Sequence, residues 1–381
     1  MNKYITFGSP SIGQEEIKSV VRCMKSGWIG TGPLVKKFEN NFANYSRSKH
    51  AIAVGSCTAA LHLSLKSINL KKDDEVIVPA MTFCSTVNSV IHSGYIPVPV
   101  DVEIDTMNID PNEIEKKITK KTKALVIVHF AGRPCNMKKI LKLVKKYKLI
   151  LIEDCAHAIE SSYREKKCGT FGLYGCFSFY VTKNLVTAEG GMIISNFIHK
   201  TDTIKQRALH GMSKDAWKRF SDNGYKHYDI IDAGFKYNMT DIQAAIGLEQ
   251  LKKINKHLKI RDKIWNEYQN FFKDYDIQTP AKIEKNTIHA KHLYTILIDE
   301  KKVGMDRDKF MMNLHKHGIG SGVHYRSIPS YTFYKKKFHW KKTNYKNSSL
   351  IGEQTVSLPL SPNLKDRDMD RIFSSIEKIL R

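Results

Sequence analysis

The sequence predicts an α/β fold with a mostly parallel sheet, followed by a smaller C-terminal α+β unit. Short apolar runs such as HAIAV (50–54), EVIVP (75–79) and LILIED (149–154) alternate with amphipathic helical stretches. These runs are continuously apolar, which is typical of strands that helices cover on both faces. A chain of 381 residues is long enough for two domains. We expect a large domain over 1–250 and a small domain over 251–381.

The large domain is predicted to open with a helix over the apolar positions 17–24. Ser11, with Gln14 three residues later, matches a capping box and predicts where this helix begins. Gly27 predicts where it ends. Strands and helices then alternate. The expected strands, with the helices that follow them, cover 50–54 with 58–68, 75–79 with 83–94, 96–102, 124–130 with 137–147, and 149–154.

The last third of the chain has a different order of elements. A long helix over 241–274 is predicted to bridge the two domains. The expected elements after Pro280 are a strand over 292–299, a helix over 307–318, a strand over 321–325 and a closing helix over 366–380. No internal repeat or low-complexity linker separates the two units, so we expect them to pack closely.

Composition excludes several classes of protein. Hydrophobic residues make up 41% of the chain and charged residues 26%, as in an ordinary globular protein. No apolar run is long enough to span a bilayer, and the start MNKYITFGSP lacks the apolar core of a signal peptide. We therefore expect a cytoplasmic protein without a membrane partner. The seven cysteines are scattered and form no CxxC pair, which predicts reduced thiols and neither a disulfide framework nor a zinc site.

The net charge of +24 would suit a nucleic-acid partner, but its distribution argues against one. Lysines occur in nearly every predicted helix. The one dense aromatic and basic segment is TFYKKKFHWKKTNYK (332–346), and no nucleic-acid-binding motif accompanies it. We expect no nucleic-acid partner. An acidic small-molecule substrate, or a general bias toward lysine, explains the charge equally well.

Two ionisable residues stand just after predicted strands. Lys183 follows the aromatic start of FSFYVTKNLVTAEGG (177–191), where it is either a solvated strand end or a buried amine that attacks a carbonyl group. Asp154 ends the apolar run LILIED, where it either caps the next turn or holds a cation in a dry place. Ligands of such sheets bind beyond the carboxyl ends of the strands, so both residues are candidates for a site.

Other strand ends supply complementary groups. Cys57 and Thr58 open a helix after HAIAV, which makes either a plain helix cap or a site for an anion. Phe83 offers a flat face to a ring, or belongs to the core, and Ser178 lies close in sequence to Lys183. An amine for an aldehyde, a carboxylate for a pyridinium, a phosphate cradle and an aromatic plate all match pyridoxal 5′-phosphate (PLP).

Ten blocks spread over nearly the whole chain carry a resemblance to one family. The chain resembles the nucleotide-sugar aminotransferases of the fold-type I PLP enzymes, often named after DegT, DnrJ and StrS, whose large domain holds a mostly parallel seven-stranded sheet. The blocks are SGWIGTGP, AVGSCTAALHLSL, VPAMTFCSTVNSV, VDVEIDTMNIDP, VHFAGRP, IEDCAHAI, FSFYVTKNLVTAEGGMI, GFKYNMTDIQAAIGLEQL, GSGVHYRSIP and SLPLSPNL.

The resemblance implies a role for each cofactor-binding residue. Lys183 would bind the PLP aldehyde covalently, Asp154 would pair with the ring nitrogen, and both would be catalytic together with His157 beside the ring. Phe83 would stack on the ring. The phosphate would be held by Cys57, Thr58 and Ser178 of one subunit and Asn238 of its partner, in a homodimer with shared active sites. From the residues alone, the favoured role of Asn238 is instead a cap of the helix that begins near Asp241.

The same resemblance suggests the substrates. SGWIGTGP, LHGMSKDAW and GFKYNMTDI are most similar to the branch that aminates 4-keto sugars, including enzymes that make UDP-4-amino-4-deoxy-L-arabinose. This implies L-glutamate as amino donor and a nucleotide-linked ketosugar as acceptor, in glycan or lipopolysaccharide-type biosynthesis. Trp28, His324 and Tyr325 would face the sugar. The alternatives are a 3-ketosugar aminotransferase of the same family and a non-catalytic basic binding protein with the same fold.

Some positions depart from the commoner family pattern. Cys57 and Cys155 replace small residues, Asn136 stands where an aspartate is usual, and Asn238 replaces a frequent arginine. None of these changes removes a catalytic group. Family members that act as dehydratases resemble this chain but carry histidine at the position of Lys183, so the lysine favours transamination.

Overall fold

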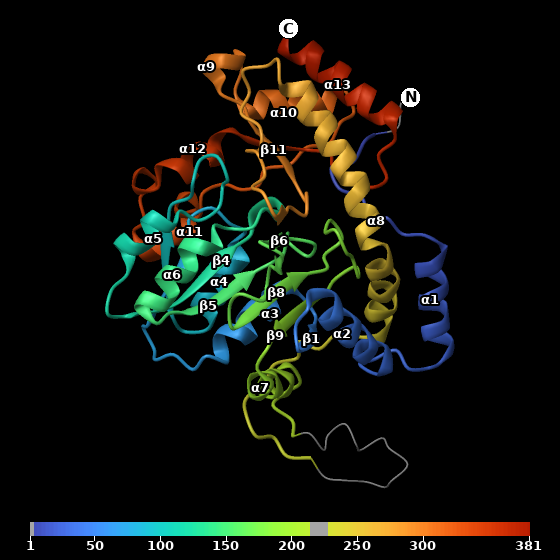
Figure 1. The fold of residues 1–381 in the computed structure, drawn as a ribbon, viewed down its shortest axis with the longest axis vertical. Helices are drawn as coiled ribbons and strands as arrows, with labels where there is room; N and C mark the ends of the chain where they lie inside the picture. The colour runs from blue at the N-terminus through green and yellow to red at the C-terminus, as the bar shows by residue number, and fades with distance from the viewer. Residues whose placement is uncertain (1–3, 214–227) are drawn as a thin grey trace.

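The computed structural model describes residues 4–213 and 228–381. A seven-stranded sheet forms its centre, in the order β1-β9-β8-β5-β4-β2-β3 (Figure 1). This confirms the predicted α/β fold. The strands are β1 (His50–Val54), β2 (Glu75–Pro79), β3 (Ile96–Val100), β4 (Thr122–Val128), β5 (Ile150–Asp154), β8 (Tyr174–Ser178) and β9 (Gly191–Ser195).

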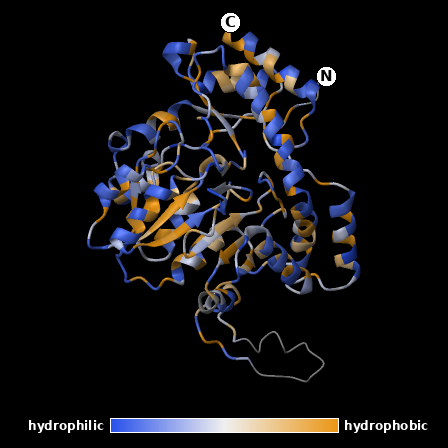
Figure 2. Cartoon of the chain, in the orientation of Figure 1, coloured by the Kyte–Doolittle hydropathy of each residue, from blue (hydrophilic) through white to orange (hydrophobic). Residues whose placement is uncertain are grey.

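The sheet is mostly parallel, as predicted. Strand β9 runs antiparallel to its neighbours β1 and β8, while the other neighbouring strands are parallel. The central strands are among the most apolar segments of the chain (Figure 2). The parallel strands β4, β5 and β8 therefore end at one edge, where Asp154 pairs in register with Val128 on one side and Cys176 on the other.

Helices cover both faces of the sheet, which explains the continuously apolar strands. In β4, Val126 packs against α3 and α4, while Leu125 and Ile127 pack on the opposite face with α5 and α6. A third buried cluster joins β1, β8 and β9 to α2 and α8. The helices around the sheet are α2 (Pro33–Ser46), α3 (Cys57–Lys66), α4 (Cys84–His92), α5 (Pro111–Lys117), α6 (Met137–Tyr147) and α7 (Ile198–Ala208).

The C-terminal unit has its own core around a two-stranded antiparallel sheet of β11 and β12. Ile5, from the start of the chain, also lies in this core. The predicted domain boundary at 250 falls within one continuous helix, α8 (Asp241–Phe272). The other elements of the unit are β11 (Tyr294–Leu297), α9 (Glu300–Val303), α10 (Arg307–Lys316), α11 (Thr332–Phe338), α12 (Lys346–Gln354), β12 (Thr355–Leu358) and α13 (Asp366–Leu380).

Short elements complete the described chain. Strands β6 (Ser162–Tyr163), β7 (Lys166–Lys167) and β10 (Thr287–Ile288) form a small sheet. Three 3₁₀ turns are η1 (Phe130–Gly132), η3 (Ile328–Ser330) and η4 (Lys342–Asn344). Among the described residues, no helix has both the length and the apolar character needed to cross a membrane. The end of the block LHGMSKDAW, residues 214–217, lies outside the described residues.

The predicted start of the first helix is wrong. Helix α1 (Gln14–Lys25) begins after Gly13, whose backbone N–H donates to the Glu16 carboxylate at 2.9 Å. Gln14 is already the first helical residue, so it cannot close a capping box on Ser11. The predicted end is confirmed, because Gly27 follows the helix with a φ of +74°.

The predicted strand over 321–325 is also wrong. Only Gly322 makes a bridge there, opposite Ser357, and the strand that pairs with β11 is β12. The chain leaves β12 after Gly322, which allows His324 and Tyr325 to line a cavity instead of continuing a ladder.

Candidate active site

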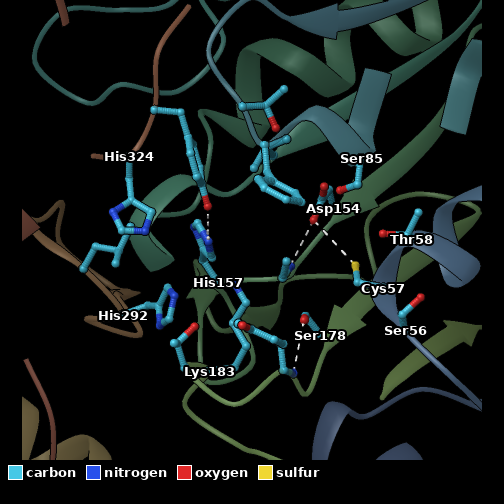
Figure 3. Close-up of a pocket in the computed structure, with 18 of the residues that line it drawn as sticks. Ser56, Cys57, Thr58, Ser85, Asp154, His157, Ser178, Lys183, His292 and His324 are labelled. Carbon is cyan, nitrogen blue, oxygen red and sulfur yellow. Dashed lines mark hydrogen bonds between the residues drawn. The ribbon is translucent and has the colours of Figure 1, made fainter. Parts of the chain in front are cut away.

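A cavity of about 460 Å³ lies at the carboxyl ends of the central parallel strands, where α/β sheets place their ligands (Figure 3). The structure brings together on its wall all of the predicted site residues except Asn238 and Trp28. Those on the wall are Cys57, Thr58, Phe83, Asp154, His157, Ser178, Lys183, His324 and Tyr325.

Lys183 lies in the turn between β8 and β9, where its backbone N–H donates to the Tyr180 carbonyl at 2.8 Å. Burial lowers the pKa of its amine to about 8, although the thiol of Cys57 and the carboxyl of Asp154 act in the opposite direction. A lowered pKa raises the fraction of neutral, nucleophilic amine near neutral pH. The residue is therefore suited to attack a carbonyl group.

Asp154 ends β5 with its carboxylate almost fully buried. One oxygen accepts from the Thr86 hydroxyl at 2.8 Å, and the other accepts from the Ala156 backbone N–H at 3.1 Å. Burial raises the pKa of this carboxyl, because these two neutral donors replace only part of the water it loses. A cationic N–H entering the cavity would supply the missing charge, which is what a protonated pyridine nitrogen offers.

His157 and Tyr325 form a hydrogen-bonded pair in the cavity. The Ala131 backbone N–H donates to His157 Nδ1 at 3.2 Å, so the ring proton of the neutral imidazole sits on Nε2. His157 Nε2 lies 3.1 Å from the Tyr325 hydroxyl and donates to it. Burial holds the pKa of His157 well below its usual range and raises that of Tyr325. The phenol therefore keeps its proton and can donate it to a ligand.

His292, which was not predicted from the sequence, also lines the cavity. The Asn184 side chain donates to the Glu160 carboxylate at 2.9 Å, which turns its carbonyl oxygen toward His292 Nδ1 at 3.0 Å. His292 Nδ1 must carry the proton, so Nε2 is left as an acceptor. Arg261 pairs with the same Glu160. His292 lies just before β11, so it is not among the residues that follow strands, where the sequence predicts site residues.

His324 adds a third neutral imidazole. Its Nδ1 lies 2.8 Å from the Ser357 hydroxyl, and its ring stacks on Phe7 with centroids 5.3 Å apart. Burial, with a smaller effect of the Lys183 charge, lowers its pKa to about 3. This part of the wall therefore offers uncharged donors and acceptors, which suit the hydroxyl groups of a sugar.

The N-terminus of α3 opens on the same cavity and can hold a phosphate. Ser56 caps this helix, accepting from the Ala59 backbone N–H at 3.1 Å, and Cys57 and Thr58 are its first residues. The positive end of the helix and its free N–H groups favour an anion there. Gly191 allows β9 to approach this turn closely, because a Cβ there would lie 2.5 Å from the carbonyl carbon of Ser56.

Asn238 and Trp28 lie apart from the catalytic cavity. They line a second cavity of about 480 Å³, where the Asn238 side chain donates to the Thr31 hydroxyl at 2.6 Å. The alternative that Asn238 caps α8 is wrong, because Thr240 occupies the capping position and accepts from the Gln243 N–H at 3.3 Å. Within one chain, neither residue reaches the cavity that holds Lys183.

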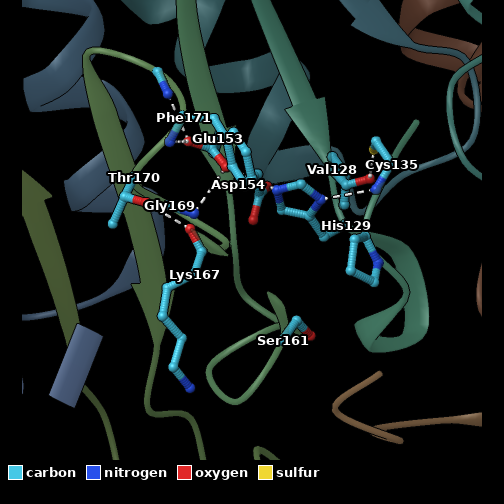
Figure 4. A network of polar contacts seen from close by, with 12 residues as sticks. Val128, His129, Cys135, Glu153, Asp154, Ser161, Lys167, Gly169, Thr170 and Phe171 are labelled. Atoms are coloured by element: carbon cyan, nitrogen blue, oxygen red, sulfur yellow. Dashed lines mark hydrogen bonds and ion pairs between the residues drawn. The ribbon is translucent and has the colours of Figure 1, made fainter. Parts of the chain in front are cut away.

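A buried polar network supports β5 from the side opposite Asp154 (Figure 4). The Glu153 carboxylate accepts from the backbone N–H groups of Gly169, Phe171 and Gly172, each at 2.7 Å. His129 Nε2 donates to it at 3.0 Å, because the Cys135 N–H occupies Nδ1. Glu153, His129 and the nearby Cys155 have the residue types of a metal site, but these hydrogen bonds already use the ligand atoms of the first two. The network anchors the strand that carries Asp154.

The model of the DegT/DnrJ/EryC1/StrS aminotransferase family matches residues 10–377. The chain belongs to this family. It is 40% identical over 381 residues to the spore coat polysaccharide biosynthesis protein SpsC of Bacillus subtilis, covering 100% of this chain and 98% of SpsC. It is thus a PLP-dependent aminotransferase of a family that acts on sugars, which favours the enzyme over the non-catalytic alternative.

Solved structures agree over the full length. PseC of Helicobacter pylori, an aminotransferase involved in the biosynthesis of pseudoaminic acid, superposes with a TM-score of 0.93 at 30% identity, over 99% of each chain. Spr1654 of Streptococcus pneumoniae, solved in PLP and pyridoxamine phosphate (PMP) forms, superposes with a TM-score of 0.92 at 31% identity, over 99% of this chain and 98% of that one. The fold-type I architecture is therefore confirmed, and the cavity around Lys183 fits the cofactor of this family.

Proposed function

We propose that this enzyme transfers the amino group of L-glutamate to a 4-keto nucleotide sugar, yielding a 4-amino-deoxy nucleotide sugar for the biosynthesis of a glycan or lipopolysaccharide. The observation that carries the proposal is a nucleophilic amine, Lys183, and a buried carboxylate, Asp154, on one cavity with neutral hydrogen-bonding walls. The 4-keto position is supported by the resemblance of the blocks around Trp28 and Asn238 to that branch of the family.

When bound, PLP supplies an electron sink for the carbanion that forms when a proton leaves the donor carbon. Lys183 would hold the cofactor through its amine, and Asp154 would keep the ring nitrogen protonated. The N-terminus of α3 and Ser178 would bind the phosphate, and Phe83 and His157 would contact the ring. When it is not bonded to the cofactor, Lys183 Nζ would carry a proton from the donor α-carbon to the cofactor in the first half of the cycle, and from the cofactor to the sugar carbon in the second.

The hydrogen bond between His157 and Tyr325 points the hydroxyl hydrogen of Tyr325 into the cavity. Because His157 donates to the Tyr325 oxygen, the phenolic proton points away from the imidazole and can donate to an oxygen of the cofactor or the sugar. His324 and His292 offer neutral ring nitrogens to sugar hydroxyl groups. Neutral walls let these groups bind the sugar without competing with Asp154 for the ring nitrogen.

The enzyme is proposed to act as a homodimer in the cytoplasm. Asn238 and Trp28 lie away from the catalytic cavity of their own chain, which supports their service to the site of a partner subunit. All seven cysteines are free thiols, which supports a reducing compartment.

Mass spectrometry of the product tests this function. The holoenzyme is incubated with L-glutamate and a panel of UDP-, dTDP- and GDP-linked 4-keto and 3-keto sugars. We expect the mass of one 4-keto sugar to change as it does when a keto group becomes an amino group. An equal amount of 2-oxoglutarate should form. Amination of the 3-keto sugars alone, or of none of the panel, would contradict the proposal.

A further inference from the structure

A third cavity opens beside the catalytic one, and Phe83 lines both. This aromatic groove, of about 440 Å³, lies between α4 and the segment around α11, and is walled by four rings from Phe83, Tyr331, Phe333 and Tyr334. Phe83 and Phe333 are 55% and 54% exposed although they are apolar. Exposed rings that face one groove indicate a surface for a flat ligand, because stacking on aromatic side chains is how proteins hold nucleobases.

A positive charge lies beside the aromatic groove. Arg326 directly follows Tyr325 of the catalytic cavity, and its guanidinium carbon lies 5.2 Å from the ring centroid of Tyr331 in the aromatic groove. The side chain of Arg326 is exposed, so its donors are accessible to a ligand. A guanidinium in this place matches a diphosphate that passes from one cavity to the other.

The aromatic groove also contains a polar group of fixed orientation. The Tyr334 hydroxyl donates to the Asn88 carbonyl oxygen at 2.7 Å. Because the Asn88 oxygen accepts this hydrogen bond, the Nδ2 end of the amide is left to donate to a carbonyl oxygen on the edge of a base. Rings, a cation and an amide are together the groups that recognise a nucleoside diphosphate.

We propose that the aromatic groove binds the base of the nucleotide-sugar substrate, with Phe333 and Tyr331 stacking on it and Arg326 holding the diphosphate. The inference rests on the proposed function, because it assigns a place to the nucleotide of that substrate. The sugar then lies in the catalytic cavity beside Lys183, and Phe83 marks the border between the two parts.

Calorimetric titration of the PLP-loaded enzyme with UDP, dTDP and GDP, and with inorganic pyrophosphate, tests the assignment. We expect at least one nucleoside diphosphate to bind at least tenfold more tightly than pyrophosphate. Phe333→Ala should remove most of this preference, because it deletes a stacking ring and leaves the phosphate contacts. Arg326→Gln should weaken both the nucleotide and pyrophosphate. Phe197→Ala is the matched control, since Phe197 is also 55% exposed and lines neither cavity.

Two results would overturn the inference: no nucleoside diphosphate binds more tightly than pyrophosphate, or Phe333→Ala binds the preferred nucleotide as tightly as Phe197→Ala does. A separate absorbance measurement on the wild-type enzyme distinguishes this outcome from a failure of the proposed function. Glutamate should convert the bound cofactor from its PLP to its PMP absorbance without any nucleotide. If that conversion occurs while the groove fails its test, only the groove is wrong; if it does not occur, the donor assignment fails.

Discussion

At the scale of single residues, burial decides the chemistry of the site. The same dry cavity lowers the pKa of the Lys183 amine and raises the pKa of the Asp154 carboxyl, because it disfavours both charged forms. It also keeps the imidazole of His157 neutral and the phenol of Tyr325 protonated. Each group is thereby prepared for a ligand that brings its own charges.

The first prediction concerns Asp154. Asp154→Asn should lower the rate of transamination by about a hundredfold or more, because a neutral ring nitrogen makes PLP a poor electron sink. Rates of single turnovers with glutamate measure the effect. Asp306→Asn is the control, since Asp306 caps α10 on the surface and asparagine caps equally well. A loss of less than about tenfold, or ~1.4 kcal/mol, would mean that Asp154 only supports the turn that follows it.

The second prediction concerns pH. Only the neutral form of Lys183 attacks the aldehyde, so the rate at which the apoenzyme takes up PLP should rise with pH and level off above a midpoint of about 8. Stopped-flow absorbance of the bound cofactor measures this profile. A midpoint near 10.5, the ordinary value for lysine, would show that the amine is solvated and not buried.

At the level of single residues, the sequence predicted the site residues that follow strands. Lys183 and Asp154 stand out because an ionisable side chain after a strongly apolar strand requires an explanation. Thr86, Asn184 and His292 escape the same reasoning, because their importance comes from contacts with residues distant in the chain. Thr86 reaches Asp154 across 68 positions, and no local pattern records such a pairing.

At the scale of elements, α8 ties the first helices to the sheet. Its first residue, Asp241, accepts from the backbone N–H groups of Gly32, Leu34 and Val35 at 2.8 to 3.0 Å. These N–H groups begin α2 and have no partner within that helix. Further along the same helix, Arg261 pairs with Glu160 near the catalytic cavity, so α8 connects two distant supports.

The third prediction tests that support. Asp241→Ala should lower the free energy of unfolding by about 2 kcal/mol or more, because it leaves buried N–H groups without an acceptor. Denaturant titration followed by fluorescence measures the change. Asp366→Ala is the control, since its carboxylate pairs with Lys263 on the surface and should cost less than about 1 kcal/mol. Equal losses in the two variants would contradict the capping role of Asp241.

Element-level prediction succeeded where one periodicity dominated. The buried strands follow from short, continuously apolar runs, and the long helix from Asp241 follows from a long stretch rich in helix-favouring residues. It failed over 321–325 because polar and apolar residues alternate there as in a strand, whereas the side chains of His324 and Tyr325 line the cavity. It also failed at the start of α1, where the backbone N–H of Gly13 donates to the Glu16 carboxylate. Gly13 has no side chain, so its residue type does not indicate a capping position.

At the scale of the whole molecule, the location of Asn238 is the strongest reason to expect a shared active site. Its side chain bonds to Thr31 at the second cavity, and Asn238 does not line the cavity that holds Lys183 in its own chain. The sequence could suggest this only through family resemblance, because the contacts of a second subunit leave no periodicity in the first.

The fourth prediction is complementation between two inactive subunits. Lys183→Ala and Asn238→Ala chains are mixed under conditions that exchange dimers. A mixed dimer has one site with both lesions and one wild-type site, so activity should return to roughly a quarter of the wild-type level with random pairing. The separate mutants, each clearly impaired, are the controls. A mixture that never exceeds their average would show that Asn238 serves its own chain.

The central claim is that PLP binds covalently to Lys183 in the cavity described above. Borohydride reduction of the holoenzyme, followed by peptide mass spectrometry, tests it most directly. We expect the reduced cofactor on Lys183 alone and its loss from Lys183→Arg. Lys291 is the internal competitor, because burial also lowers the pKa of its amine to about 8. Cofactor attached to Lys291, to another lysine, or to none would contradict the account.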